Sequence, residues 1–281
     1  MNILDAAVIQ EYIRMCDDVW LLGWHERNAG NLTYRMDKDE VMECEAHFEN
    51  HGEWVDMGVT AKNLSGEFFI TTGAGKFFRN VSLDAKSNIG IVEIDETGKR
   101  YRVVWGLSDC RPTSEFPSHI LNHSVKKDVT KGKNRIIYHA HPPAVISLTS
   151  ILPLTAKDFS NALWRTITEC PIVFPAGVGV VDWMMPGGTE VAELTGRLMN
   201  TFDAVVWAHH GMFVSGSSFD EAFGLMHTIE KSADIYIRTV STGKDVLGSI
   251  SDEQLCAVAK EFNLENFNYS LLESINRPPA P

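Results

Sequence analysis

The sequence predicts a mixed α/β fold in which a central β-sheet carries helices on both faces, within a single domain that spans residues 1–281. Short β-prone segments alternate with amphipathic segments along the whole chain, as in layered α/β proteins. Two of the β-prone segments flank a tight polar turn, so the sheet contains at least one antiparallel hairpin. The length of 281 residues permits one large domain or two small ones, and no repeat, low-complexity tract or linker divides the chain.

The N-terminal half begins with apolar residues spaced three or four apart, which predict an amphipathic helix over residues 5–24. A polar turn at 28–31 leads into a β-prone segment, 31–36. Residues 37–62 are acidic and weakly periodic, which is typical of an insertion or surface loop. A strand at 66–72 precedes a glycine-containing loop at 73–80, and the hairpin follows, with strands at 88–94 and 100–106 around the turn 95–98.

After the hairpin, residues 112–115 predict a helix start with a Ser or Thr cap, and this helix continues to residue 127. The prolines at 142–143 permit another helix start. Further strands are expected at 134–141, 171–175, 205–210 and 212–216, and further helices at 189–201 and 218–240. Ser251 opens the last helix, with Gln254 placed for a capping box. Residues 276–281 are expected to fray.

Composition excludes several classes of protein. The chain has 25 Lys and Arg against 37 Asp and Glu, a net charge of -12, which argues against generic binding to nucleic acid or to anionic membranes. The five cysteines are scattered without C-x-x-C spacing and predict free thiols in a reducing cytoplasm. The N-terminus lacks a cationic start, which argues against a signal peptide, and the longest apolar stretch, 171–181, is too short to span a bilayer.

The strongest chemical signal is the pair His139 and His141 at the end of an apolar strand. Residues i and i+2 on a strand point to the same face, so both imidazoles can reach one metal ion. A single histidine in such a place is more often a hydrogen-bonded core residue than a ligand. A pair at this spacing, where a strand meets a loop, favours a metal site.

A second β-prone segment, 203–211, ends in His209 and His210 and can supply a third ligand. On a regular strand these two side chains point to opposite faces, so one of them joins the site, and the spacing alone does not choose between them. Three histidines without a fourth protein ligand leave a coordination position open. That arrangement is typical of catalytic rather than structural zinc.

A competing cluster lies on one predicted helix, where Glu115, His119 and His123 share a face at i, i+4 and i+8. One interpretation is a second metal site. The more favoured interpretation is a helix that packs other residues inward and leaves its histidines partly exposed or capped. Glu115, at the helix start, is a candidate base or ligand, or simply a partner for the helix dipole.

Three small polar turns suit an anion: residues 28–31, residues 71–76, and the helix start at Thr113 and Ser114. In the second turn, backbone N–H groups can face a phosphate, with Lys76 and Arg79 nearby. The P-loop spacing is absent. Together, three histidines, a glutamate and these turns predict a metal-assisted reaction on a phosphorylated small molecule. The reaction type, hydrolase, epimerase or aldolase, stays open.

The sequence resembles the class II, zinc-dependent sugar-phosphate aldolases, and within them the branch that acts on L-rhamnulose 1-phosphate. The resemblance covers nearly the whole chain. The HAH pair and the distant His-Gly are shared across the superfamily, whereas GKFFRN and TECPIVFP are particular to this branch. The segments that carry the resemblance are 23–35, 69–80, 103–109, 112–121, 139–141, 163–179, 183–187 and 209–216.

The resemblance implies an assignment for each candidate residue. It implies one Zn²⁺ per subunit held by His139, His141 and His210, with His209 not a ligand. It implies that Glu115 is the catalytic glutamate and that the other histidines of its helix are not ligands. The implied phosphate and substrate cradle is Asn28, Gly30, Asn31, Gly73, Gly75, Thr113 and Ser114. Ala74 departs from the expected serine, so a side-chain contact is lost, although its backbone N–H can still bind phosphate.

The resemblance also implies that Glu169 reaches the active site of an adjacent subunit in a homotetramer with four-fold symmetry. The implied reaction is reversible cleavage of L-rhamnulose 1-phosphate to dihydroxyacetone phosphate and L-lactaldehyde, in L-rhamnose degradation. Alternatives within the superfamily are an L-fuculose-phosphate aldolase, a pentulose-phosphate 4-epimerase and a related dehydratase. An alternative of another class is a non-catalytic, aldolase-like interaction module, which is expected to lack the histidines or the glutamate.

Overall fold

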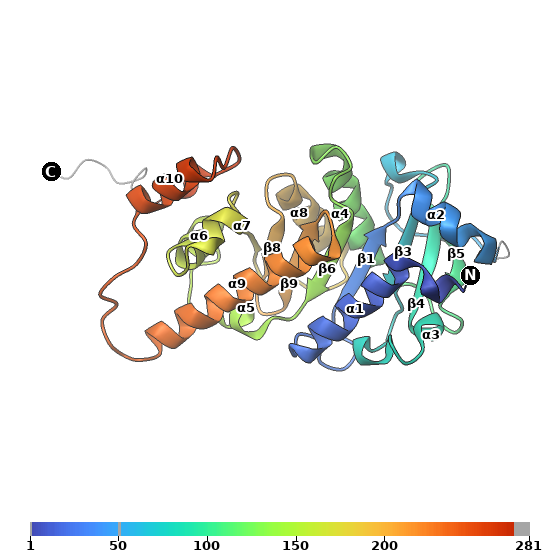
Figure 1. The fold of residues 1–281 in the computed structure, drawn as a ribbon, viewed down its shortest axis with the longest axis horizontal. Coiled ribbons are helices and arrows are strands. Elements are labelled where there is room, and N and C mark those ends of the chain that lie inside the picture. Colours follow the sequence, from blue (N-terminus) through green and yellow to red (C-terminus); the bar gives the residue numbers. More distant parts are fainter. Residues whose placement is uncertain (1, 50–51, 273–281) are drawn as a thin grey trace. The chain divides into compact units, whose positions relative to one another are not determined.

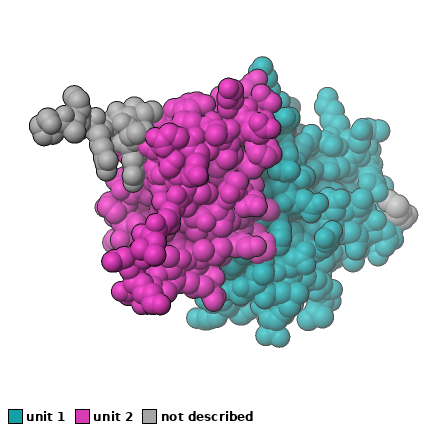
Figure 2. All heavy atoms as spheres, turned by 60° about the vertical axis from the view of Figure 1, so that its left-hand side comes forward, with its two compact units in different colours: residues 1–141, 185–200, 215–223 teal, residues 142–184, 201–214, 224–281 magenta. Residues whose placement is uncertain are grey.

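A computed structural model of the chain describes residues 2–49 and 52–272 (Figure 1). The chain forms two compact units, each assembled from separate stretches of sequence (Figure 2). Unit 1 contains residues 1–141, 185–200 and 215–223, and unit 2 contains residues 142–184, 201–214 and 224–281. The expectation of a single domain over residues 1–281 stays a prediction.

The described residues form a nine-stranded sheet in the order β2-β5-β4-β3-β1-β6-β9-β8-β7. Strand pairs β2–β5, β5–β4, β4–β3, β3–β1, β1–β6 and β9–β8 are antiparallel, and β8–β7 is parallel. The predicted mixed sheet is therefore confirmed. The strands are β1 Asn31–Arg35, β2 Val55–Asp56, β3 Phe68–Thr72, β4 Ile89–Ile94, β5 Arg100–Gly106, β6 Ile136–Ala140, β7 Gly179–Val181, β8 Ala204–Trp207 and β9 Gly211–Gly216.

Helices connect most of these strands. The α-helices are α1 Ala7–Leu21, α2 Lys38–Cys44, α3 Ala85–Asn88, α4 Phe116–Val129, α5 Pro143–Leu148, α6 Ala156–Trp164, α7 Glu169–Val173, α8 Thr189–Met199, α9 Phe219–Val240 and α10 Asp252–Glu261. Short 3-10 helices are η1 Ile3–Asp5, η2 Glu45–His47, η3 Lys62–Leu64, η4 Phe78–Asn80 and η5 Tyr269–Leu271.

Helices cover both faces of the sheet in unit 1, as the alternation along β1 demonstrates. The ring of Tyr34 stacks on Phe219, which also packs edge-on against Tyr12 of α1. The neighbouring Thr33 points the other way and bonds His119 of α4 at 2.8 Å. Successive side chains of a strand alternate between faces, so α1 and α4 lie on opposite sides of this sheet. The predicted two-sided cover is thereby confirmed for unit 1.

Residues 37–62 are not simply a surface loop. Asp37 caps α2 in a capping box with Glu40, so acidic residues that suggested a solvated loop instead begin a helix. Strand β2 pairs with β5 at the edge of the sheet. Met57 and, just beyond the segment, Leu64 are buried in a core cluster of unit 1. Composition alone missed this because two strand residues and one short helix carry too little periodicity.

The prediction of a strand at 171–175 is wrong. Residues Glu169–Val173 form helix α7, and the strand comes later, as β7. A short apolar run bounded by prolines fits a buried strand or a short buried helix equally well. Pro171 is tolerated in the first turn of α7, where its missing N–H has no partner to lose.

Several other predictions are confirmed. Strands β4 and β5 form the antiparallel hairpin around residues 95–98, with a register shift at Ile91 and Val92. Ser251 and Gln254 form the capping box that begins α10. All five cysteines are free. In the part of the chain that the structure describes, no helix combines the length and apolar character that crossing a membrane requires. The fraying expected for residues 276–281 lies outside the described residues.

Candidate metal centre and active site

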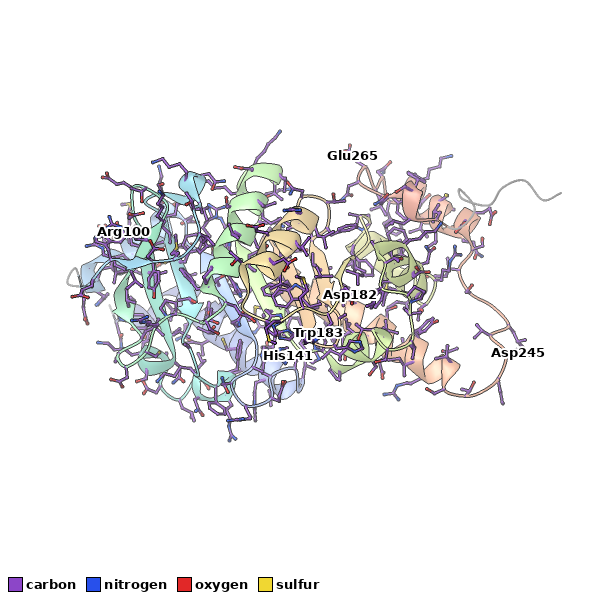
Figure 3. The ribbon with its side chains drawn as sticks, turned by 180° about the vertical axis from the view of Figure 1, so that it is seen from behind. Arg100, His141, Asp182, Trp183, Asp245 and Glu265 are labelled. Atoms are coloured by element: carbon purple, nitrogen blue, oxygen red, sulfur yellow. The ribbon has the colours of Figure 1, made fainter. Side chains whose placement is uncertain are left out.

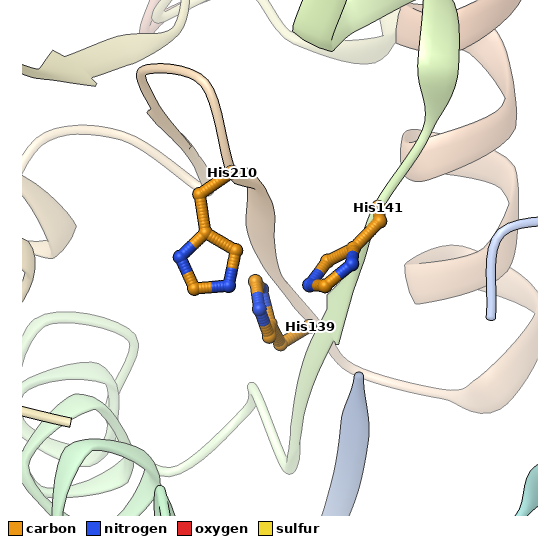
Figure 4. Close-up of side chains that lie close together, drawn as sticks. All are labelled: His139, His141 and His210. Atoms are coloured by element: carbon orange, nitrogen blue, oxygen red, sulfur yellow. The ribbon is translucent and has the colours of Figure 1, made fainter. Parts of the chain in front are cut away.

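Three histidines form the candidate metal centre. His139, His141 and His210 each offer one imidazole nitrogen, and these atoms all lie within 4.8 Å of one another (Figure 4). His139 is buried, and the other two are partly exposed. Three clustered imidazole nitrogens, from one buried and two partly exposed histidines, suit a divalent metal ion with room for a further ligand.

The end of β6 positions the first two histidines. His139 lies within the strand and pairs with Asn31 of β1. His141 follows the end of the strand, where its backbone N–H donates to the carbonyl of Trp24. The imidazole ring centroids are 5.2 Å apart, on one face, as the i, i+2 periodicity predicts.

The third histidine is His210, and His209 lies outside the cluster. The sequence predicts a continuous strand over residues 205–210, but β8 ends at Trp207, so the strand alternation does not reach His209 and His210. His209 has a φ of 57°, a left-handed conformation that turns the chain toward β9. The Nδ1 atom of His209 lies 3.3 Å from the Thr149 hydroxyl. The turn therefore separates two adjacent histidines into one at the cluster and one beside Thr149.

Glu115 lies beside the cluster, immediately before α4. Its carboxylate is buried, accepts a hydrogen bond from the Asn31 amide at 2.9 Å, and lies 3.8 Å from Nε2 of His139. Burial raises the pKa of Glu115, while the Asn31 amide and the nearby His141 act in the opposite direction. A raised pKa brings the proton exchange of a carboxyl group closer to neutral pH, which favours a role as general acid–base.

The start of α4 differs in detail from the predicted cap. Glu115 itself stands at the N-cap position and makes no side-chain capping bond. The Thr113 hydroxyl accepts a hydrogen bond from the backbone N–H of Glu115 at 3.3 Å. Thr113 thus fixes the backbone of Glu115, and the carboxylate stays directed at Asn31.

His119 and His123, the other two residues of the predicted helical cluster, form hydrogen bonds within the protein core and lie outside the histidine cluster. His119 and His123 are both buried, and both contact the hydroxyl of Thr33 at 2.8 Å. The sequence predicts them to be partly exposed or capped; the exposure is wrong, and both rings have hydrogen-bond partners. Their face of α4 packs on β1, where Thr33 and Asn31 give the imidazoles polar partners that compensate for their burial.

The imidazole of His25 packs against the turn that precedes β1. The imidazole stacks on Phe78 with ring centroids 3.7 Å apart, and its nitrogens bond the carbonyl of Ala29 and the hydroxyl of Tyr138 at 2.9 and 2.8 Å. Gly30 has a φ of 74°, and a Cβ there would collide with this imidazole. Asn28 is exposed above the turn. Glycine is therefore required for the chain to pass over His25.

The turn at 73–75 meets the start of α4, because Gly73 forms an isolated bridge with Pro112. Two of its three backbone N–H groups already have partners: Gly73 donates to Asn88, and Ala74 donates to Arg111, each at 2.9 Å. Phosphate binding by the Ala74 N–H, which is paired with Arg111 in this structure, stays a prediction. Exposed Gly75, at a φ of 72°, is the remaining candidate in this turn, with exposed Ser114 across the bridge.

Glu169 is the first residue of α7, and its side chain is exposed. This position agrees with a carboxylate offered to another subunit. Its role there stays a prediction, as does the tetramer.

Comparison with known proteins assigns the family. A family model, the class II aldolase and adducin N-terminal domain, matches residues 10–237. The chain belongs to this family. Rhamnulose-1-phosphate aldolase of Klebsiella pneumoniae is 41% identical over 271 residues, covering 96% of this chain and 98% of that protein.

Two solved structures share the fold of this class II aldolase domain. A sugar-phosphate aldolase from Thermotoga maritima superimposes with a TM-score of 0.73 at 27% identity, over 86% of this chain and 98% of that one. L-fuculose 1-phosphate aldolase superimposes with a TM-score of 0.60 at 22% identity, over 92% and 97%. These likenesses confirm the predicted fold class.

Sequence reasoning missed Glu26. Its carboxylate contacts Nδ1 of His141 at 2.7 Å, across a separation of 115 residues (His141 is labelled in Figure 3). An acceptor on Nδ1 directs the other nitrogen, Nε2, outward as a ligand atom, which is how metal-binding histidines are commonly oriented. The contact between Glu26 and His141 therefore supports the assignment of the histidine cluster as a metal site. Glu26 belongs to the quoted segment 23–35, but only the fold brings it to His141.

Replacing Glu26 by Ala is expected to raise the metal dissociation constant about tenfold, the lower end of such effects, because the carboxylate is largely exposed. Gln keeps an acceptor and should cost less. Metal titration of the two variants checks this. Glu45→Ala, which removes another exposed carboxylate, is the matched control. Equal dissociation constants for Glu26→Ala and Glu45→Ala would remove Glu26 from the site.

His25 predicts a pH dependence of stability. Burial lowers the pKa of His25 to about 3, whereas an unfolded histidine titrates near 6.5. The unfolded chain therefore binds the extra proton between these values, and stability falls as pH falls below about 6.5. The loss from this group between pH 7 and pH 5 is about 2 kcal/mol.

The free energy of unfolding of wild type and His25→Asn, measured by denaturant titration between pH 7 and pH 5, tests this dependence. Asn can still donate to the Ala29 carbonyl but does not titrate. The unfolding free energy of the variant should therefore change less steeply with pH, by up to the slope that one bound proton contributes. Parallel curves for the two proteins would show that His25 is not the group responsible.

Proposed function

We propose that this chain catalyses the reversible, zinc-dependent aldol cleavage of L-rhamnulose 1-phosphate to dihydroxyacetone phosphate and L-lactaldehyde. The observation that carries the proposal is the buried carboxylate of Glu115, 3.8 Å from His139 in the histidine cluster. The similarity to rhamnulose-1-phosphate aldolase over 96% of the chain supports this substrate.

The reaction breaks the C3–C4 bond of the ketose. The proton of the C4 hydroxyl leaves, C4 becomes the aldehyde carbon of L-lactaldehyde, and the electron pair of the broken bond passes to C3. C3 then takes up a proton and becomes the hydroxymethyl carbon of dihydroxyacetone phosphate. In this proposal Glu115 delivers that proton to C3, and removes it in the direction of synthesis.

His139, His141 and His210 would hold the zinc ion. When bound, a zinc ion supplies a Lewis acid that lowers the energy of negative charge next to a carbonyl, so no lysine Schiff base is required. Histidine ligation also suits cobalt and other divalent ions. Glu26 would orient His141, and the Asn31 amide would keep the Glu115 carboxylate directed at the cluster.

The phosphate would bind at the polar turns, through Asn28, Gly30 and Asn31 on one side and Gly75, Thr113 and Ser114 on the other. Backbone N–H groups and hydroxyls bind anions without a basic surface, which accommodates the net charge of -12. Because the N–H groups of Gly73, Ala74 and Thr113 are already paired, Gly73 would contribute by its shape and Thr113 by its hydroxyl. A Cβ at Gly73 would meet the sulfur of Cys110 at 2.6 Å.

Glu169 of an adjacent subunit would orient the aldehyde-side oxygen, accept its proton in cleavage and protonate it in synthesis, which makes a homotetramer part of the proposal. A cytoplasmic role in L-rhamnose degradation completes it.

The experiment is a substrate panel. Purified, metal-loaded protein is given L-rhamnulose 1-phosphate, L-fuculose 1-phosphate and a pentulose 5-phosphate, and the products are identified. The proposal expects triose phosphate and L-lactaldehyde, with the highest kcat/KM for the rhamnulose ester. Preference for the fuculose ester, or epimerisation of the pentulose, would assign a neighbouring activity. No turnover of any of them, with no bound metal, would favour a non-catalytic module.

A further inference from the structure

A chain of buried side chains continues behind Glu115 in unit 1. The Asn31 amide nitrogen contacts Glu115, and the Asn31 carbonyl oxygen contacts Nε2 of His119 in a short hydrogen bond. Nδ1 of His119 lies 2.8 Å from the Thr33 hydroxyl, which lies 2.8 Å from Nε2 of His123. All five residues are buried, so each contact replaces water that a buried polar group would otherwise need.

With the Glu115 carboxyl ionised, the chemistry of these groups gives each hydrogen bond in the chain a direction. An ionised Glu115 only accepts, so Asn31 presents its NH₂ to it and its carbonyl oxygen to His119. That carbonyl only accepts, so His119 carries its proton on Nε2. Its Nδ1 then accepts from the Thr33 hydroxyl at 2.8 Å, a shorter contact than the 3.4 Å between this hydroxyl and the Ile137 carbonyl. The Thr33 oxygen then accepts from Nε2–H of His123.

The reverse direction requires a different network. If His119 carried its proton on Nδ1, its Nε2 would become an acceptor and the Asn31 amide would turn over. The amide carbonyl would then face the Glu115 carboxylate, which is unfavourable when that carboxylate is ionised. The tautomer of His119 and the orientation of Asn31 are thus coupled, through two direct contacts, to the residue that moves the proton.

We propose that His119 is a positioning residue, which holds the Asn31 amide with its NH₂ toward Glu115 and so holds the carboxylate in place for proton transfer. This inference rests on the proposed function of Glu115. The Asn31 carbonyl sets the tautomer of His119, and the Thr33 hydroxyl supports it by donating to Nδ1. Burial lowers the pKa of His119 to about 3, which agrees with a neutral imidazole in this role.

A purely structural role makes a different prediction. A histidine that only fills the core contributes to stability, and any replacement of similar size that folds should leave turnover unchanged. A positioning residue instead requires a donor at the place of Nε2. The amide of Gln reaches about as far as Nε2, whereas the amide of Asn ends near the place of Nδ1.

The variants His119→Gln and His119→Asn therefore form a matched pair. The positioning role predicts that His119→Gln keeps kcat within about threefold of wild type, while His119→Asn lowers kcat about 10- to 100-fold. Metal content and KM should stay near wild type in both. Thr33→Ser should behave like wild type, and Thr33→Val should lower kcat. Equal kcat values for the Gln and Asn variants, both folded by their melting temperatures, would overturn the proposal.

A second readout does not depend on activity. Nitrogen-15 NMR of the histidine rings in the wild-type protein reports the tautomer, and the His119 signals are assigned by their loss in His119→Gln. The proposal expects a neutral ring protonated on Nε2, and a ring protonated on Nδ1 would overturn it. If wild type proved inactive on the ketose phosphate, the proposed function would fail while this measurement still judged the network.

Discussion

Replacing Glu115 by Gln is expected to lower kcat by about 10²- to 10⁴-fold, the contribution typical of a positioned general acid–base. Gln fills the same volume and can still accept a hydrogen bond from Asn31, so the packing beside His139 is retained. It cannot exchange a proton with the reacting carbon. Steady-state kinetics of cleavage of L-rhamnulose 1-phosphate measures the effect.

Two controls separate chemistry from folding in the Glu115 experiment. The metal content of Glu115→Gln should match that of wild type, because the proposed metal ligands are the three clustered histidines and not Glu115. Glu40→Gln replaces another carboxylate of unit 1 whose pKa burial raises, and it should leave kcat unchanged. Turnover of Glu115→Gln within a few-fold of wild type would show that another group moves the proton.

Replacing His210 by Ala is expected to abolish stoichiometric metal binding and to lower turnover by about a thousandfold or more. Two imidazoles hold a divalent ion far more weakly than three, and the ion contributes several kcal/mol to stabilising the transition state. Metal content of the purified variants, measured by elemental analysis beside their activity, tests this expectation.

His209→Ala is the matched control, because it removes the neighbouring imidazole, which lies beside Thr149 and not in the cluster. It should retain about one metal ion per chain and most of the activity, with a loss confined to stability. Loss of metal from His209→Ala and its retention in His210→Ala would reverse the assignment of these two residues.

The fold was predictable where local patterns are strong. The hairpin of β4 and β5 and the capping box of α10 follow from turn and cap residues a few positions apart. The prediction of a strand at 171–175 was wrong because a short apolar run has no periodicity that distinguishes a strand from a helix. The prediction that residues 37–62 form a surface loop was wrong in part, because the acidic residues Asp37 and Glu40 cap helix α2, a role that composition does not reveal.

The sequence predicted which residues belong to the candidate site better than it predicted the contacts between them. The i, i+2 spacing placed His139 and His141 on one face, since strand geometry fixes that relation. The choice between His209 and His210 depends on a left-handed turn that spacing cannot show, and only the resemblance favoured His210. The burial of His119 depends on Thr33, a partner 86 residues away that local sequence does not identify.

The most direct test of the account measures metal content and products in the same sample. Protein is stripped with a chelator, assayed on L-rhamnulose 1-phosphate, reloaded with Zn²⁺ and assayed again. The account predicts about one ion per chain when loaded, dihydroxyacetone phosphate and L-lactaldehyde as the products, and loss and recovery of cleavage with the metal. Cleavage that continues unchanged in the metal-free protein would contradict it.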